Sequence, residues 1–221
     1  MLQNLHHKGL KALIAIVVLS FFSIPVFSQD VYSSKPSSTF FFTLGFTSSR
    51  LINDTNSYKS GILFNGGFIY TVSATDKLNI ALELLYTGKG LKQDSPLIKY
   101  RYYYIDLPLY VQLKLGENIR FNIGTQYSTF VNSQVVYIDV SKKNGINIET
   151  HTAIKNTDYG FLLGTEIDIT KTIAIAARYT ISGSTFFEKN QVNFGVFQLS
   201  FNYAAFRTYK QFFHKKRKTT E

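Results

Sequence analysis

The stretch IDLPLYVQLKL, residues 105–115, decides the fold class of this chain. Apolar side chains occupy every second position from Ile105 to Leu115, and aspartate, proline, tyrosine, glutamine and lysine stand between them. Successive side chains of a β-strand point to opposite faces, so this alternation predicts a strand with one apolar and one polar face. A tilted strand needs about 9–11 residues to cross a membrane, and this stretch is long enough.

Eight stretches with this alternation follow one another along the chain. The predicted strands are Thr39–Ser49, Gly61–Ser73, Leu78–Gly90, Tyr100–Leu115, Ile119–Val131, Thr157–Ile169, Thr172–Ser182 and Val192–Tyr203. Short turns such as Thr170-Lys171 alternate with longer loops such as 132–156. Outer-membrane barrels have short turns on the periplasmic side and long loops outside. The sequence therefore predicts an all-β fold, an eight-stranded antiparallel up-and-down transmembrane β-barrel with both chain ends in the periplasm.

Alternation alone leaves open which face of the barrel wall is apolar. A soluble lipocalin-like barrel turns its apolar face inward, around a ligand. In this chain the polar face carries mainly Asn, Thr, Gln, Ser and Gly, whereas a surface in water normally carries far more Lys and Glu. We therefore expect the apolar face to contact lipid, and we keep a soluble ligand-binding barrel as the alternative.

The last predicted strand contains two apolar phases. Val192, Phe194 and Val196 alternate in one phase, and the apolar residues from Phe197 to Tyr203 alternate in the other. A β-bulge adds one residue to a strand and reverses the side to which the following residues point. We therefore expect a bulge near Val196 or Phe197.

The two ends of the chain differ from the predicted barrel. Residues 1–28 have the basic start, apolar centre and small residue at the cleavage position that are typical of a signal peptide. Residues 29–38 are then expected to form an N-terminal periplasmic segment, 39–206 the barrel domain and 207–221 a basic periplasmic tail. Because the tail holds much of the net charge of +10, that charge does not indicate nucleic-acid binding. The absence of Cys excludes disulfides and thiolate chemistry.

Three motifs resemble the PorT-like outer-membrane β-barrel family of Gram-negative bacteria. Residues 83–90, ELLYTGKG, are similar to its E-L-x-Y-x-x-K-G strand, and residues 104–109, YIDLPL, are similar to its Y-I-[DE]-[IL]-P-L signature. Gly160 to Gly164, followed by residues 177–179 (ARY), resembles its ending. The resemblance spans residues 39–203 and implies an eight-stranded barrel in the outer membrane of a Gram-negative bacterium. Some members of the family serve protein secretion, while most have no assigned activity, so a secretion role is one expectation for this chain. Many outer-membrane proteins end on an aromatic residue of the last strand. This chain differs, because it continues past Tyr203 into the basic tail.

Several charged residues fall on the phase that faces the interior of the predicted barrel. The residues expected to form a polar network there are Glu83, Asp106, Arg120, Glu166 and Arg178. The interior of an eight-stranded barrel is just wide enough to be filled by side chains, and an isolated charge is costly to bury there. We therefore expect these acids and bases to pair as a structural polar network. A narrow channel is the alternative.

No catalytic, cofactor or metal site is predicted. Hydrolase or acyltransferase chemistry needs a positioned base, usually His. His151 lies in the longest loop with Ser141 and Asp139, and His214 lies in the tail. Because polar loops often have this composition, we expect no enzymatic activity, and we keep a loop-borne lipid-modifying enzyme as the alternative. The histidines do not have the spacing of metal ligands.

Basic residues outside the barrel wall are candidates for contact with lipid headgroups or a partner protein. Two are in the long loop, at the turn of a predicted hairpin, and the others are in the tail: Lys142, Lys143, Lys210, Lys215, Lys216, Arg217 and Lys218. Lysines beside aromatic side chains favour a membrane surface. The sequence thus predicts a non-enzymatic barrel with a structural or interaction role in the cell envelope. Its expected partners are outer-membrane lipid and an envelope or secretion protein, and not nucleic acid.

Overall fold

The structure is a computed structural model, which describes residues 32–52, 58–93, 98–138, 145–148, 156–183 and 193–211. The barrel lies within the compact unit Ser34–Lys210. Among the described residues there is no helix with the length and apolar character needed to cross a membrane.

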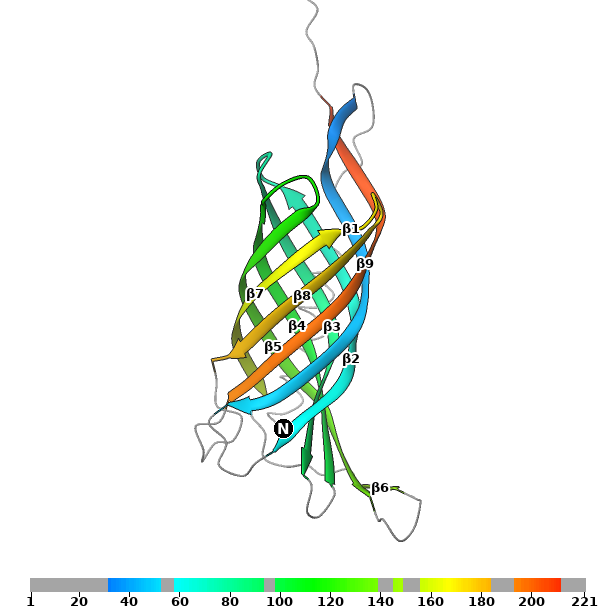
Figure 1. Ribbon diagram of the computed structural model, residues 1–221, viewed down its shortest axis with the longest axis vertical. Coiled ribbons are helices and arrows are strands. Elements are labelled where there is room, and N and C mark those ends of the chain that lie inside the picture. Colours follow the sequence, from blue (N-terminus) through cyan, green and yellow to red (C-terminus); the bar gives the residue numbers. More distant parts are fainter. Residues whose placement is uncertain are drawn as a thin grey trace, which may run out of the picture. The chain divides into compact units, whose positions relative to one another are not determined.

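Antiparallel strands form the whole of the described barrel. They are β1 (Tyr32–Ile52), β2 (Lys59–Ser73), β3 (Leu78–Gln93), β4 (Ile98–Lys114), β5 (Ile119–Ile138), β6 (Gly145–Ile148), β7 (Thr157–Asp168), β8 (Ile173–Ser182) and β9 (Asn193–Gln211). The order around the sheet is β4-β3-β2-β1-β9-β8-β7-β5, and β4 also pairs with β5, so these strands close a ring (Figure 1). The predicted eight-stranded up-and-down barrel is therefore confirmed.

The loop predicted at 132–156 contains a strand that the alternation did not reveal. Strand β5 continues to Ile138 and pairs with β6 from Val135↔Ile148 to Ile138↔Gly145. This pairing forms a hairpin, as predicted for this loop. The turn residues Lys142 and Lys143 lie outside the described residues.

Strands β1 and β9 are longer than predicted. The ladder between β1 and β2 begins at Ser38↔Val72, and the ladder between β8 and β9 ends at Ile173↔Tyr203. Strand β1 nevertheless begins at Tyr32, within the segment expected at 29–38. Strand β9 ends at Gln211, within the segment expected at 207–221. Residues beyond the ring need no apolar face, so alternation does not mark them. The predicted signal peptide, 1–28, lies outside the described residues.

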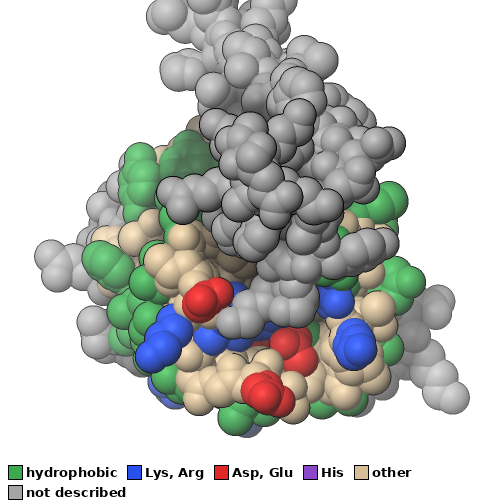
Figure 2. Space-filling view, turned by 90° about the horizontal axis from the view of Figure 1, so that it is seen from above, with side chains coloured by type: hydrophobic (Ala, Val, Ile, Leu, Met, Phe, Trp, Pro, Cys, Tyr) green, Lys and Arg blue, Asp and Glu red, His purple; other side chains and the backbone are tan. Residues whose placement is uncertain are grey.

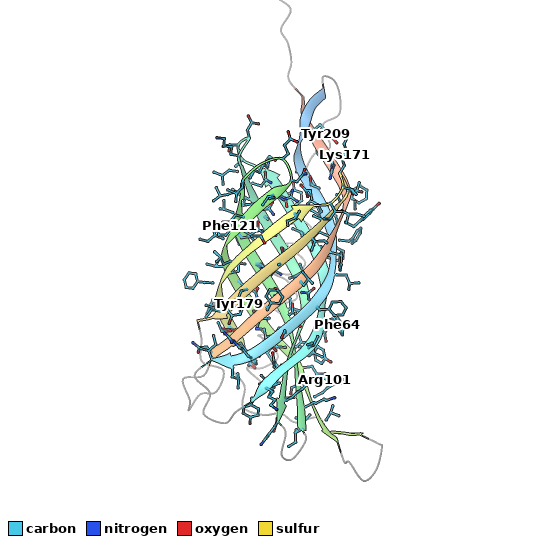
Figure 3. The ribbon with its side chains drawn as sticks, in the orientation of Figure 1. Phe64, Arg101, Phe121, Lys171, Tyr179 and Tyr209 are labelled. Atoms are coloured by element: carbon cyan, nitrogen blue, oxygen red, sulfur yellow. The ribbon has the colours of Figure 1, made fainter. Side chains whose placement is uncertain are left out.

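Apolar side chains point outward from the barrel wall and polar side chains point inward. In β7, Phe161 is 73% exposed and Leu163 is also exposed, whereas Glu166 on the opposite phase is buried. Figure 3 shows Phe64 and Phe121 projecting from the outer side of the wall. An apolar outer surface is expected for a barrel in lipid and is the reverse of a lipocalin-like barrel.

The bulge predicted near Val196 or Phe197 is wrong. The ladder between β8 and β9 runs from Ile173↔Tyr203 to Ile181↔Gly195 without a change of register. Phe194 and Val196 therefore point inward and are buried, while Phe197 points outward. Both inward residues join a cluster with Leu91, Tyr102 and Tyr104. The apolar phase changes because this part of the interior is itself apolar.

Candidate functional site

The centre of the barrel interior is held by Glu83, which lies on β3 and is 4% exposed. Arg178 Nη1 on β8 donates a hydrogen bond of 2.8 Å to Glu83 Oε2, and the Tyr110 hydroxyl on β4 donates to Glu83 Oε1. Arg178 Nε also donates to Gln198 Oε1 on β9. Strands β3 and β8 are not neighbours in the ring, so the Arg178–Glu83 bond crosses the interior.

A second group of charges lies nearer the end where the short turns are. Arg120 Nη2 on β5 is 2.7 Å from Glu166 Oε1 on β7, and it also pairs with Asp168. Gln112 Nε2 on β4 donates to Glu166 Oε2 at 3.1 Å. The structure thus brings four of the five predicted network residues into two ion pairs, Glu83 with Arg178 and Glu166 with Arg120.

Asp106, the fifth predicted network residue, makes neither an ion pair nor a hydrogen bond among the described residues. Its side chain is fully buried, and both carboxylate oxygens lack a hydrogen-bond partner. Thr87 Oγ1 and Asn65 Nδ2, on the neighbouring strands β3 and β2, are also buried without a partner. Groups of this kind in protein interiors are commonly satisfied by ordered water.

The interior near the loop end contains a buried cation that the sequence reasoning missed. Lys89 is 2% exposed, and its Nζ lies 3.6 Å from Asp158 Oδ2. The same Nζ lies 4.1 Å from the centre of the Tyr104 ring and 5.5 Å from that of Phe194. A desolvated ammonium over aromatic rings is stabilised by their π-electrons. The signal was present in the sequence, since Lys89 has the same phase as Glu83, and Asp158 the same phase as Glu166.

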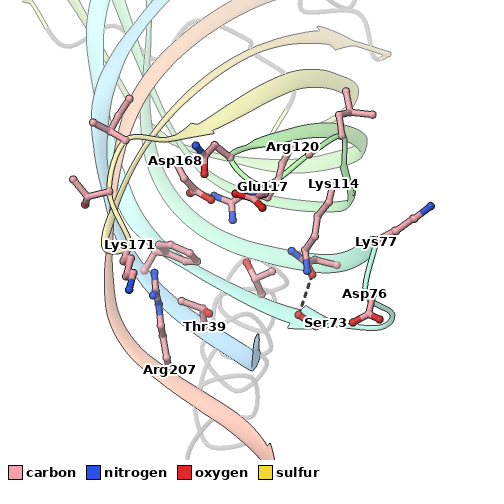
Figure 4. Close-up of a pocket in the computed structure, with 18 residues that line it drawn as sticks. Thr39, Ser73, Asp76, Lys77, Lys114, Glu117, Arg120, Asp168, Lys171 and Arg207 are labelled. Carbon is pink, nitrogen blue, oxygen red and sulfur yellow. Dashed lines mark hydrogen bonds and ion pairs between the residues drawn. The ribbon is translucent and has the colours of Figure 1, made fainter. Parts of the chain in front are cut away.

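The mouth of the barrel at the turn end forms a cavity of about 990 Å³ (Figure 4). Basic side chains outnumber acidic ones in its lining, which includes Asp76, Lys77, Lys114, Glu117, Arg120, Asp168, Lys171 and Arg207. Figure 2, which views this end, shows charged side chains of both signs close together on its uncovered part.

The predicted contact and loop residues are mostly outside the described part of the chain. These are Lys142, Lys143, Lys215, Lys216, Arg217 and Lys218, together with His151, Ser141, Asp139 and His214. Lys210 lies in β9. Among the described residues, no group of three His, Cys, Asp or Glu side chains is placed to hold a metal ion.

Comparison with protein families identifies the barrel. Residues 14–204 match the model of the outer membrane protein beta-barrel domain. The chain belongs to this family. Its members are outer-membrane proteins of Gram-negative bacteria, which agrees with the apolar outer surface. A search of curated proteins found none that matches the chain.

The chain is also similar to solved barrels of low sequence identity. Ail, the attachment invasion locus protein of Yersinia pestis, is 14% identical with a TM-score of 0.46, over 77% of this chain and 99% of that one. Neisserial surface protein A is 12% identical with a TM-score of 0.47, over 75% and 97%. OprG from Pseudomonas aeruginosa is 12% identical with a TM-score of 0.42, over 76% and 96%.

Proposed function

We propose that the chain is a non-enzymatic outer-membrane barrel with a structural or interaction role in the cell envelope. The observation that carries the proposal is the Glu83–Arg178 ion pair, which joins β3 to β8 across the interior, with Tyr110 on β4 and Gln198 on β9 bonded to its two ends. A barrel whose interior is occupied by its own side chains offers its two ends and its outer surface for contact. A barrel of this kind is therefore better suited to binding at these surfaces than to conducting ions through its interior.

The proposal includes finer points that rest on sequence. Export by the signal peptide 1–28 is supported by its pattern, and a link to protein secretion is supported by the PorT-like motifs. The basic residues of the long loop and the tail support contact with lipid headgroups or an envelope protein.

Planar-bilayer recording tests the interior part of the proposal. The purified chain is expected to give no conductance steps, because the Glu83–Arg178 pair and the Tyr110 hydroxyl occupy the centre. A Glu83→Ala/Arg178→Ala variant is the comparison, since removing both long side chains opens space at that level. Regular conductance steps from the unaltered chain would overturn the proposal of a closed barrel.

Site-directed crosslinking tests the interaction role, because the natural chain has no Cys. Lys142→Cys and Lys216→Cys variants, treated with a thiol crosslinker in intact cells, are expected to give an adduct with one envelope protein. Lys77→Cys, in the turn after β2, is the control. Adducts no stronger than this control at both positions would argue against a partner there.

A His151→Ala variant is expected to behave like the unaltered chain, and loss of function would instead support a loop-borne enzyme.

A further inference from the structure

The turn-end mouth, defined by the cavity residues named above, divides into two unlike sides. On the β5 and β7 side, Arg120 is neutralised by Glu166 and Asp168. On the side formed by β9, β1 and the turn before β8, the cations are Arg207 and Lys171, and neither forms an ion pair with a described residue. Among the described residues, the two cations on the Arg207 and Lys171 side therefore have no acidic partner.

Backbone pairing places the elements of this uncompensated side next to one another. The Ala204 amide on β9 donates to the Thr172 carbonyl at 2.8 Å, which holds the turn containing Lys171 against β9. Strand β1 is the other neighbour of β9. Figure 4 shows Arg207, Lys171 and Thr39 on the same side of the mouth. Two cations from different elements thus border one part of the cavity.

Hydrogen-bond donors without acceptors accompany these charges. The Arg207 Nε is buried and has no hydrogen-bond partner among the described residues. Thr71 also lines the cavity, is 6% exposed and lies directly opposite Thr39 in the β1–β2 ladder, and its hydroxyl likewise has no partner among the described residues. Guanidinium and ammonium groups can only donate, so their missing partner is an acceptor. An acceptor that also carries negative charge satisfies both the donors and the uncompensated charge.

We propose that this side of the mouth is a binding site for a small organic anion that carries a carboxylate or phosphate group. Arg207 and Lys171 bind the anionic oxygens, and the Thr71 hydroxyl adds a hydrogen bond. The cavity of about 990 Å³ is as large as sites for drug-sized ligands, so it accommodates more than a single inorganic ion. The site lies at the opposite end from the long loops, so it is separate from any loop-borne contact.

Titration calorimetry on the full chain, purified from membranes in an uncharged detergent, tests the site. The probes are tetraglutamate, which supplies carboxylates, and glucose 6-phosphate, which supplies a phosphate, with tetraglutamine as the neutral control. At least one anionic probe is expected to bind, and more weakly as salt is raised. Which probe binds identifies the preferred anionic group. Binding of neither probe, or equal binding of tetraglutamine, would overturn the proposal.

Variants assign the binding to the named residues. An Arg207→Gln/Lys171→Gln double variant is expected to bind about tenfold more weakly or worse, because each charge-assisted hydrogen bond lost is worth that order of affinity. Lys77→Gln removes an exposed cation on the opposite side of the mouth from Arg207 and Lys171 (Figure 4), and this variant is expected to bind normally. Lys171→Gln alone changes an exposed turn residue and keeps the test available if the double variant does not fold. Unchanged binding by either of these Lys171 variants would contradict the site.

Discussion

At the scale of single residues, the barrel interior is a set of charges that are buried and mostly neutralised in place. Glu83 meets Arg178, Glu166 meets Arg120, and Lys89 meets Asp158. Breaking a buried ion pair by removing one partner is more costly than losing the attraction, because the other charge stays buried. The stability of these pairs is therefore best measured by removing each partner separately.

Replacing Lys89 by Ala is expected to lower the free energy of unfolding by about 3 kcal/mol, because Asp158 loses its cation and Tyr104 and Phe194 lose contacts. Urea unfolding in lipid vesicles measures the change in the free energy of unfolding. It is followed by gel mobility and by tyrosine fluorescence, which is readable because the chain has no Trp. Lys77→Ala removes an exposed lysine and is the control. Equal stability of the two variants would contradict the buried position of Lys89.

A double-mutant cycle on Glu83→Gln and Arg178→Gln tests the central ion pair. Each single variant is expected to be less stable, while the double variant is expected to be more stable than the sum of the two predicts, with a coupling of about 1–3 kcal/mol. Unfolding midpoints in urea provide the four values. Additive effects, within about 0.5 kcal/mol, would indicate that the two side chains do not interact.

At the scale of strands, alternation identified the ring and failed where its physical cause is absent. The eight ring strands are readable because lipid lies on one side of each and a polar interior on the other. Strand β6 is short and pairs with β5 beyond the ring, so neither face must be apolar. In β9 the phase changed without a bulge, because Phe194 faces an aromatic part of the interior. The alternation correctly placed Asp106 on the interior face. It does not predict which buried acidic side chain forms an ion pair with a basic one.

Cysteine labelling tests the register of β9. A thiol placed by Phe197→Cys is expected to react with a membrane-soluble maleimide, because residue 197 faces outward, whereas one placed by Phe194→Cys is expected to be protected. The reaction is followed by mass shift in vesicles, and the chain has no native Cys to interfere. Labelling of both variants would reinstate the bulge, because a bulge would turn residue 194 outward as well.

At the scale of the whole molecule, one closed wall separates an apolar outer surface from a charged interior. Because exposed apolar residues such as Leu44, Phe46 and Ile62 cover the outside, the fold requires lipid or detergent in place of water. The candidate site at the turn end could not be predicted from the sequence, since Arg207, Lys171 and Thr71 lie far apart in the chain and line one cavity only in the folded ring. Net charge alone gave no sign of it.

The most direct test of the account is the gel mobility of the refolded chain with and without boiling, together with its far-ultraviolet circular dichroism. In detergent, we expect a compact band that shifts on boiling and a β-sheet spectrum, with neither seen in plain buffer. A chain that folds into a stable β structure in buffer without detergent would contradict the lipid-facing barrel.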